Sequence, residues 1–157
     1  MPDISPRFAC DAMLGGLARW LRAAGYDAAW QSGIADWDLV RLALRDGRIL
    51  LSSDTGIFKI GIVRDGEVPA LFIPHGLARK QQLAFVFHEL HLTARAPRCM
   101  RCGGELHDVP KESVKELVPA RSYAWLENFQ RCAACGKIFW EGTHWRRIEH
   151  TLRDLEN

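Results

Sequence analysis

The sequence predicts an α/β protein built from two units. Over residues 1–96, short apolar segments alternate with segments of helical periodicity, an order that builds a mostly parallel sheet of about four strands between two helical layers. From residue 97 this alternation stops, and two Cys-x-x-Cys pairs enclose a stretch of helix formers. We therefore expect a three-layer α/β domain over residues 1–96 and a four-cysteine zinc ribbon with a helical insertion over residues 97–157.

Four apolar segments are predicted to be the strands of the sheet. Each is short, apolar in character and bounded by polar or turn-forming residues. The strands are expected at residues 7–10, 27–31, 48–53 and 68–73. The third contains the run Ile49-Leu-Leu51, which is typical of a strand buried on both faces.

Helical periodicity falls between the predicted strands. Leu14, Leu17, Ala18 and Leu21 recur at helical spacing, and Gly25 is placed to end that helix. Two aspartates, at residues 36 and 38, lie at a predicted helix start, where the helix dipole favours anions. The remaining predictions are the end of this helix at Gly47, a short helix or turn at residues 55–62 and a helix from Arg79 to His91.

The four cysteines of the second unit have the spacing of a metal site. Cys99 and Cys102 form one Cys-x-x-Cys motif, and Cys132 and Cys135 form the other. Each motif can bring two thiolates to one ion. Together they supply the four sulfurs of a tetrahedral Zn²⁺ site, with two disulfides or a redox-active pair as the alternatives. Between and after the pairs we expect helix formers at residues 109–118, a strand at 138–140 and a charged surface helix at 145–155.

Composition narrows the classes of function. The formal net charge is +2, and basic and acidic residues are balanced in both units, so bulk charge does not indicate a nucleic-acid partner. No apolar run approaches the length of a membrane span, and we expect a cytoplasmic protein without a membrane partner. Thiols stay reduced in that compartment, which favours metal over disulfides for the paired cysteines, and Cys10 is expected to be a buried core thiol.

Three aspartates are candidates for a catalytic metal site. Asp11 and Asp54 each follow a predicted strand, and ligands of open parallel sheets gather outside the carboxyl ends of the strands. Asp38 lies at a helix start that can face the same edge. Converging carboxylates repel one another unless a cation intervenes, and hard oxygen ligands select Mg²⁺ or Mn²⁺. The structural alternative is that these residues are only turn formers and helix caps.

Three runs of residues together resemble a known family. They are Asp11-Ala-Met-Leu-Gly-Gly-Leu-Ala-Arg-Trp-Leu-Arg-Ala-Ala-Gly-Tyr-Asp27, Arg48-Ile-Leu-Leu-Ser-Ser-Asp54 and, after the cysteine pairs, Phe139-Trp-Glu-Gly-Thr-His-Trp145. The family is the Mut-seven C-terminal RNase family, and the resemblance covers Phe8 to about Ile148. It implies a PIN-like RNase domain that carries a zinc ribbon.

The resemblance also implies roles for individual residues. It places Asp11, Asp38 and Asp54 at the acidic positions of a PIN-like site for Mg²⁺ or Mn²⁺, with Asp36 nearest to the fourth acidic residue of many PIN nucleases. Ser53 departs from the family pattern, which has a basic residue there. The zinc ligands of the family match Cys99, Cys102, Cys132 and Cys135.

Basic and aromatic residues are candidates for contact with RNA. Arg19 and Arg22 lie one turn apart on the helix that begins beside Asp11, where they are predicted to hold a phosphate, with a solvated helix face as the alternative. The aromatic residues of the ribbon either stack on unpaired bases or build its core. They are Tyr123, Trp125, Phe129, Trp140 and Trp145, and seven basic residues interleave with them.

These observations lead to a first hypothesis and two alternatives. The first is a Mg²⁺- or Mn²⁺-dependent endoribonuclease that hydrolyses RNA at Asp11, Asp38 and Asp54, with the ribbon helping to bind RNA. The second is a binding module that holds RNA or protein without turnover. The third is a toxin-like regulatory protein that works with a protein partner such as a small antitoxin.

Overall fold

A computed structural model describes residues 4–156 of the chain. The first sheet is parallel throughout and has the strand order β2-β1-β3-β4. Its strands are β1 (Phe8–Cys10), β2 (Ala28–Ala29), β3 (Ile49–Ser52) and β4 (Ala70–Phe72). All four lie inside the predicted strand segments, and the predicted α/β class with a four-stranded parallel sheet is confirmed.

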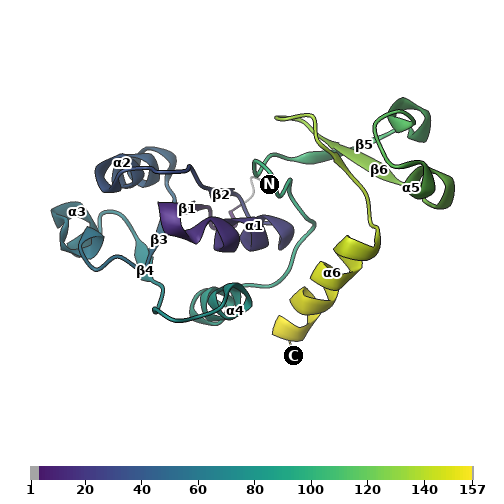
Figure 1. Ribbon diagram of the computed structural model, residues 1–157. Helices are drawn as coiled ribbons and strands as arrows, with labels where there is room; N and C mark the ends of the chain where they lie inside the picture. Colours follow the sequence, from purple (N-terminus) through teal and green to yellow (C-terminus); the bar gives the residue numbers. More distant parts are fainter. Residues whose placement is uncertain (1–3, 157) are drawn as a thin grey trace.

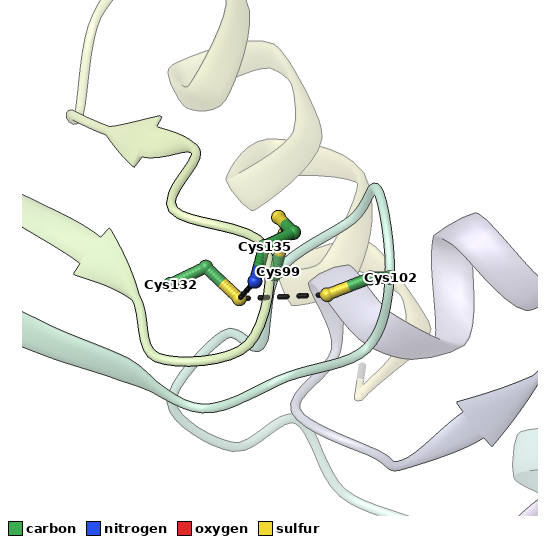
Figure 2. A group of neighbouring side chains, drawn as sticks. All are labelled: Cys99, Cys102, Cys132 and Cys135. Carbon is green, nitrogen blue, oxygen red and sulfur yellow. Dashed lines mark hydrogen bonds between the residues drawn. The ribbon is translucent and has the colours of Figure 1, made fainter.

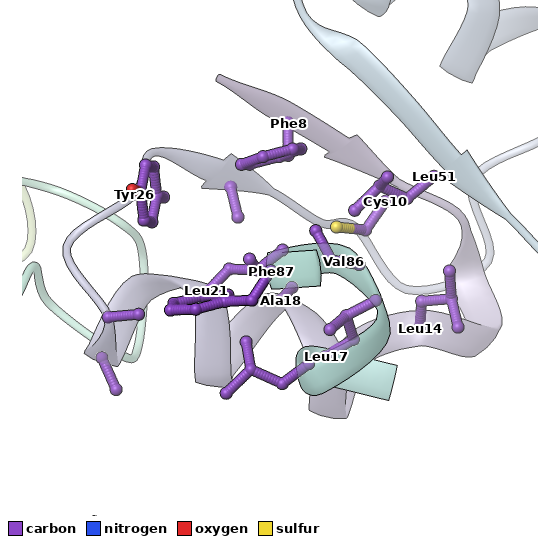
Figure 3. Packing of buried hydrophobic residues seen from close by; sticks show 14 of the residues in the cluster. Phe8, Cys10, Leu14, Leu17, Ala18, Leu21, Tyr26, Leu51, Val86 and Phe87 are labelled. Atoms are coloured by element: carbon purple, nitrogen blue, oxygen red, sulfur yellow. The ribbon is translucent and has the colours of Figure 1, made fainter. Parts of the chain in front are cut away.

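Helices cover both faces of this sheet (Figure 1). The helical segments of the first unit are η1 (Ala12–Leu14), α1 (Gly15–Ala23), α2 (Asp36–Asp46), η2 (Ile57–Lys59), α3 (Gly61–Arg64) and α4 (Arg79–Leu90). Alternate strand residues point to opposite faces, as the two-residue period of a strand requires. Phe8 and Cys10 therefore pack against α1 and α4 (Figure 3), whereas Ala9 and Leu50 pack against α2 and the η2–α3 segment.

The second unit is a small antiparallel sheet with the strand order β5-β6-β7. Its strands are β5 (Leu106–Val109), β6 (Phe129–Cys132) and β7 (Ile138–Phe139), and the insertion between β5 and β6 holds η3 (Lys111–Val114) and α5 (Ala120–Trp125). Val114, Val118 and Phe129 form the buried centre of this unit. The insertion supplies two of these three residues, Val114 and Val118.

The final helix, α6 (Thr143–Leu155), packs on the α/β domain. The sequence predicted a charged surface helix here, and one side of α6 is charged and exposed. Its other side carries Trp145, Ile148 and Leu152, which are buried in the same cluster as Phe8 and Leu17. The boundary at residues 96 and 97 therefore separates the two sheets, while α6 returns across it to the first core. None of the helices described is both long and apolar enough to span a bilayer.

Candidate functional site

Asp11 and Asp54 leave neighbouring strands at the same edge of the parallel sheet. Asp11 directly follows β1, and Asp54 comes two residues after the end of β3. The two strands pair in parallel with Cys10 beside Leu51, so their carboxyl ends coincide. The edge predicted from the sequence to collect ligands therefore carries both aspartates.

The Asp11 carboxylate is buried and held from both oxygens. Only 7% of the surface of Asp11 is exposed. Oδ1 accepts a hydrogen bond of 2.9 Å from the Met13 N–H. Oδ2 accepts one of 2.5 Å from the Ser52 hydroxyl and one of 3.3 Å from the Ser53 N–H. These donors fix the orientation of the carboxylate before any ligand arrives.

Ser52 connects the two strand-end aspartates. Its hydroxyl, which is fully buried, donates to Asp11 and accepts a hydrogen bond of 2.9 Å from the Asp54 N–H. The Asp54 Oδ1 atom in turn accepts from the Gly56 N–H at 2.8 Å. Sequence reasoning missed Ser52, and the available signal was its place at the buried end of an apolar strand, next to the acidic position. Ser53, which departs from the family pattern, donates to the Ile73 carbonyl at 2.8 Å.

Asp36 is the third carboxylate at this edge. It lies in the first turn of α2, and its side chain is within hydrogen-bonding reach of Asp54. Although Asp36 is an exposed residue, slight desolvation raises its pKa, and the negative charges of Asp54 and Asp11 raise it further. Carboxyl groups this close favour a shared proton or a bound cation. Asp36, expected as the nearest match to a fourth acidic residue, therefore lies beside Asp54 at this edge.

Asp38 lies elsewhere on α2. Two residues along a helix correspond to about 200° of rotation, so Asp36 and Asp38 point in different directions. The Asp38 carboxylate pairs with the Arg41 guanidinium at 3.3 Å, and its side chain is 64% exposed. The structure thus brings together Asp11, Asp36 and Asp54, and it leaves Asp38 on the solvent side of the helix.

A cleft with a volume of about 420 Å³ opens beside Asp54. One wall comes from Met13 and Leu14 in η1, and another from the segment between β4 and α4. The other lining residues are Ser53, Thr55, Pro74, His75, Gly76 and Gln82. Of the three gathered aspartates, Asp54 alone lines this cleft. A carboxylate beside an open cleft suits Mg²⁺ or Mn²⁺, which keep coordination positions free for phosphate oxygens.

The four paired cysteines converge on one point, as predicted (Figure 2). Their sulfur atoms all lie within 4.8 Å of one another. The Cys99 and Cys135 sulfurs are 3.6 Å apart, and those of Cys102 and Cys132 are 3.4 Å apart. A tetrahedral zinc site with Zn–S bonds of about 2.3 Å needs sulfur separations of about 3.8 Å. Among residues 4–156 this is the one group of three or more ligand atoms gathered so closely.

The electrostatics of the thiols also suit a cation. Burial, joined by the neighbouring thiols, raises the pKa of Cys102 to about 12. Burial also acts to raise the pKa of Cys132, but the N–H groups of Cys135 and Ala134 and the neighbouring thiols outweigh it and lower this pKa to about 6. Cys132 therefore ionises readily, whereas the pKa values of Cys99 and Cys102 are raised by burial, and a bound metal would favour their thiolate forms.

Arg22 holds the first cysteine pair against the α/β domain. It is 4% exposed, and its Nε atom donates to the Ala28 carbonyl at 2.8 Å. Its Nη1 atom donates to the carbonyls of Met100 and Arg101 at 3.0 and 3.1 Å. The three hydrogen bonds of Arg22 go to backbone carbonyls, which gives it a structural role, and the substrate contact predicted for it stays a prediction. Arg19 is exposed, and its predicted phosphate contact stays a prediction.

Most aromatic residues of the ribbon are structural. Phe129 is buried and Tyr123 stacks on it with ring centroids 6.4 Å apart, whereas Trp145 belongs to the first core. Trp140 packs at the edge of the ribbon core. Trp125 is the exception, since it is 81% exposed.

A family model described as the Mut7-C RNAse domain matches residues 6–152. The matched range includes both sheets, the three gathered aspartates and all four paired cysteines. No curated protein and no solved structure matches the chain.

Proposed function

The chain belongs to the Mut7-C RNAse domain family, and on this basis we propose that it is a metal-dependent ribonuclease that hydrolyses RNA phosphodiester bonds at the acidic edge of its parallel sheet. The observation that carries the proposal is that Asp11, Asp36 and Asp54 gather at one edge of the sheet, where Asp54 lines an open cleft. The four cysteines hold structural zinc in this proposal, and their ribbon helps to bind the RNA.

The residues of the edge have distinct roles. Asp11 is fixed by three donors and offers an oriented carboxylate, whereas Asp54 and Asp36 are exposed and Asp54 lines the cleft. Bound Mg²⁺ or Mn²⁺ would supply a nucleophilic water and offset the charge that develops on the phosphate. In the overall reaction, water adds to phosphorus and the bond from phosphorus to the leaving ribose oxygen breaks.

Asp38 has an outer role in this proposal. The sequence and the resemblance assign it to the metal, but its carboxylate pairs with Arg41 on the exposed side of α2. We therefore assign the inner position to Asp36 and expect Asp38 to influence the site only through its charge. Ser52 acts as a positioning residue, because it sets the relation between Asp11 and Asp54 without facing the substrate.

Cleavage of labelled RNA in the presence of Mn²⁺ tests the proposal. The wild-type chain is compared with Asp54→Asn and with the matched control Asp65→Asn. The Asp65 carboxylate lies away from the acidic edge and forms an ion pair of 2.9 Å with Arg64. We expect Asp54→Asn to lose cleavage and Asp65→Asn to retain it. Equal cleavage by all three proteins would reject the proposed site. Tight RNA binding without cleavage by the wild-type chain would instead select the non-catalytic binding module.

A further inference from the structure

A second cleft lies where α1 meets the two cysteine pairs, and positively charged side chains line it. Its volume is about 420 Å³. Four exposed cations line it: Arg19 from α1, Arg79 from α4, Arg101 between the two cysteines of the first pair, and Lys137 just after the second pair. The buried Arg22 also reaches the lining, but its hydrogen bonds go to backbone carbonyls. No acidic residue lines the cleft. In a chain whose net charge is only +2, this local concentration of cations is a feature of the fold.

These four cations have no anionic partner within residues 4–156. None of them appears in an ion pair, and all four side chains are in exposed residues. Arg41, Arg45, Arg64 and Arg153, by contrast, each pair with a nearby carboxylate. Unpaired like charges around one cleft repel one another, and a bound polyanion would relieve this repulsion.

Two glycines let the walls of the cleft approach the α1 backbone. A Cβ atom on Gly15 would lie 2.9 Å from the Trp30 ring, and one on Gly16 would lie 2.5 Å from the Arg79 Nε atom. The Trp30 Nε1 atom donates to the Ala12 carbonyl at 3.0 Å, which fixes the ring while 38% of the residue remains exposed. The cleft therefore combines cations with an immobilised aromatic surface.

The cleft lined by Arg19, Arg79, Arg101 and Lys137, which we call the basic cleft, adjoins the cleft beside Asp54, which we call the acidic cleft, along two walls. Leu14 lines the acidic cleft and the next residue, Gly15, lines the basic one. On α4, Gln82 faces the acidic cleft and Arg79, three residues earlier, faces the basic one. Residues three apart on a helix are neighbours on its surface. A ligand that fills one cleft can therefore continue directly into the other.

We propose that the basic cleft binds the phosphate backbone of single-stranded RNA and leads it to the acidic edge, while Trp30 stacks on an unpaired base. This inference rests on the proposed function and names the path of its substrate. An aromatic surface favours a single strand, because the bases of a duplex are already stacked on each other. Arg101 lies between Cys99 and Cys102, and Lys137 lies two residues after Cys135. The metal site therefore sets the position of two of the four exposed cations.

Binding without turnover tests the inference. The full chain with Asp54→Asn, loaded with zinc, is titrated into a fluorescent, unstructured RNA, and anisotropy is followed over a series of salt concentrations. Arg79→Ala/Arg101→Ala is compared with Lys80→Ala/Lys115→Ala, which removes two exposed charges from the same helix and the same ribbon outside the cleft. Trp30→Leu, which fills space beside Gly15 without an aromatic face, tests stacking.

We expect the cleft variant to bind at least tenfold more weakly than the control variant. We also expect the slope of log affinity against log salt concentration to become shallower by about 1.4, because two phosphate contacts are lost. Trp30→Leu should weaken binding about fivefold or more. Equal weakening in both double variants, failure of the parent chain to bind RNA, or preference for duplex RNA or an acidic polypeptide would overturn the inference. An inactive acidic edge would leave the binding result unchanged, so the two proposals fail separately.

Discussion

The guanidinium of Arg22 donates a 3.0 Å hydrogen bond to the carbonyl of Met100, a residue 78 positions later in the chain. Arg22→Met keeps the length of the side chain but leaves the carbonyls of Ala28, Met100 and Arg101 without this donor. We expect the free energy of unfolding to fall by about 2–4 kcal/mol, measured by urea denaturation. The exposed Arg19→Met serves as control and should change it by about 0.5 kcal/mol or less.

Asp36 and Asp38 should differ sharply in cleavage assays. Asp36→Asn removes a carboxylate beside Asp54, whereas Asp38→Asn removes one that pairs with Arg41 at 3.3 Å. Initial rates of RNA cleavage over a Mn²⁺ titration should show a lower rate and a weaker apparent Mn²⁺ affinity for Asp36→Asn. Asp38→Asn should stay within about threefold of wild type, because an exposed charge acts through water. The reverse ranking would restore Asp38 to the inner position.

Ser52→Ala tests positioning at the acidic edge. The change removes the donor to Asp11 and the acceptor from Asp54 while leaving every carboxylate in place. We expect RNA cleavage to fall about tenfold to a hundredfold, the range for partners that orient metal ligands. The apparent Mn²⁺ affinity should weaken in parallel, and Ser52→Thr, which keeps a hydroxyl, should recover part of both. Unchanged Mn²⁺ affinity in Ser52→Ala would exclude this role.

The stability of the protein without divalent cations should respond to pH through Asp36. Burial and the charges of Asp54 and Asp11 raise the pKa of Asp36 above its ordinary 3.8, so the folded state favours the protonated form. This carboxyl therefore lowers stability at pH above its raised pKa, and the penalty disappears as pH falls through that pKa. Asp36→Asn should unfold at higher urea than wild type near neutral pH, with the difference shrinking at acidic pH. A constant difference would exclude this origin.

Removal of zinc should affect the two sheets unequally. Because the ribbon has only a small buried centre, a chelator should remove the protection of the amides around Val114 and Phe129 from hydrogen exchange. Amides of β1 and β3 should remain protected, because they belong to a separate core. Their protection should fall somewhat, because loss of zinc disturbs the Arg22 contacts and α6. Complete loss of protection in both sheets at the same chelator concentration would show that they form a single folding unit.

Much of the fold was predictable because buried parallel strands consist of continuous runs of apolar residues. The segment Ile49–Ser52 is buried on both sides, and its composition alone located the strand. Strands β5 and β6 were not predicted, since Leu106–Val109 and Phe129–Cys132 mix polar and apolar residues in a sheet with one small core. The cysteine site needed no tertiary information, because the spacing of its ligands is itself the geometric constraint.

Side-chain direction at the acidic edge could not be predicted from the sequence. Asp36 and Asp38 share the first turn of one helix, and only the packing of Leu39, Val40 and Ala43 under the sheet decides which of the aspartates faces Asp54. Likewise, Arg22 is exposed or buried according to where residues 100 and 101 lie, far along the chain. Local periodicity places such residues on a helix, but long-range contacts assign their roles.

Because α6 returns to the first core, a metal ion bound by the cysteines would reduce the entropic cost of folding. From the end of α4 to the start of α6 the chain runs through about 50 residues, and closing so long a loop is unfavourable. Zinc bound between Cys99 and Cys135 would shorten this path to under about 20 residues and lower the closure cost by about 1 kcal/mol. The ion would then favour the docking of a distant helix, and the docking of Trp145 should become faster once the metal has bound.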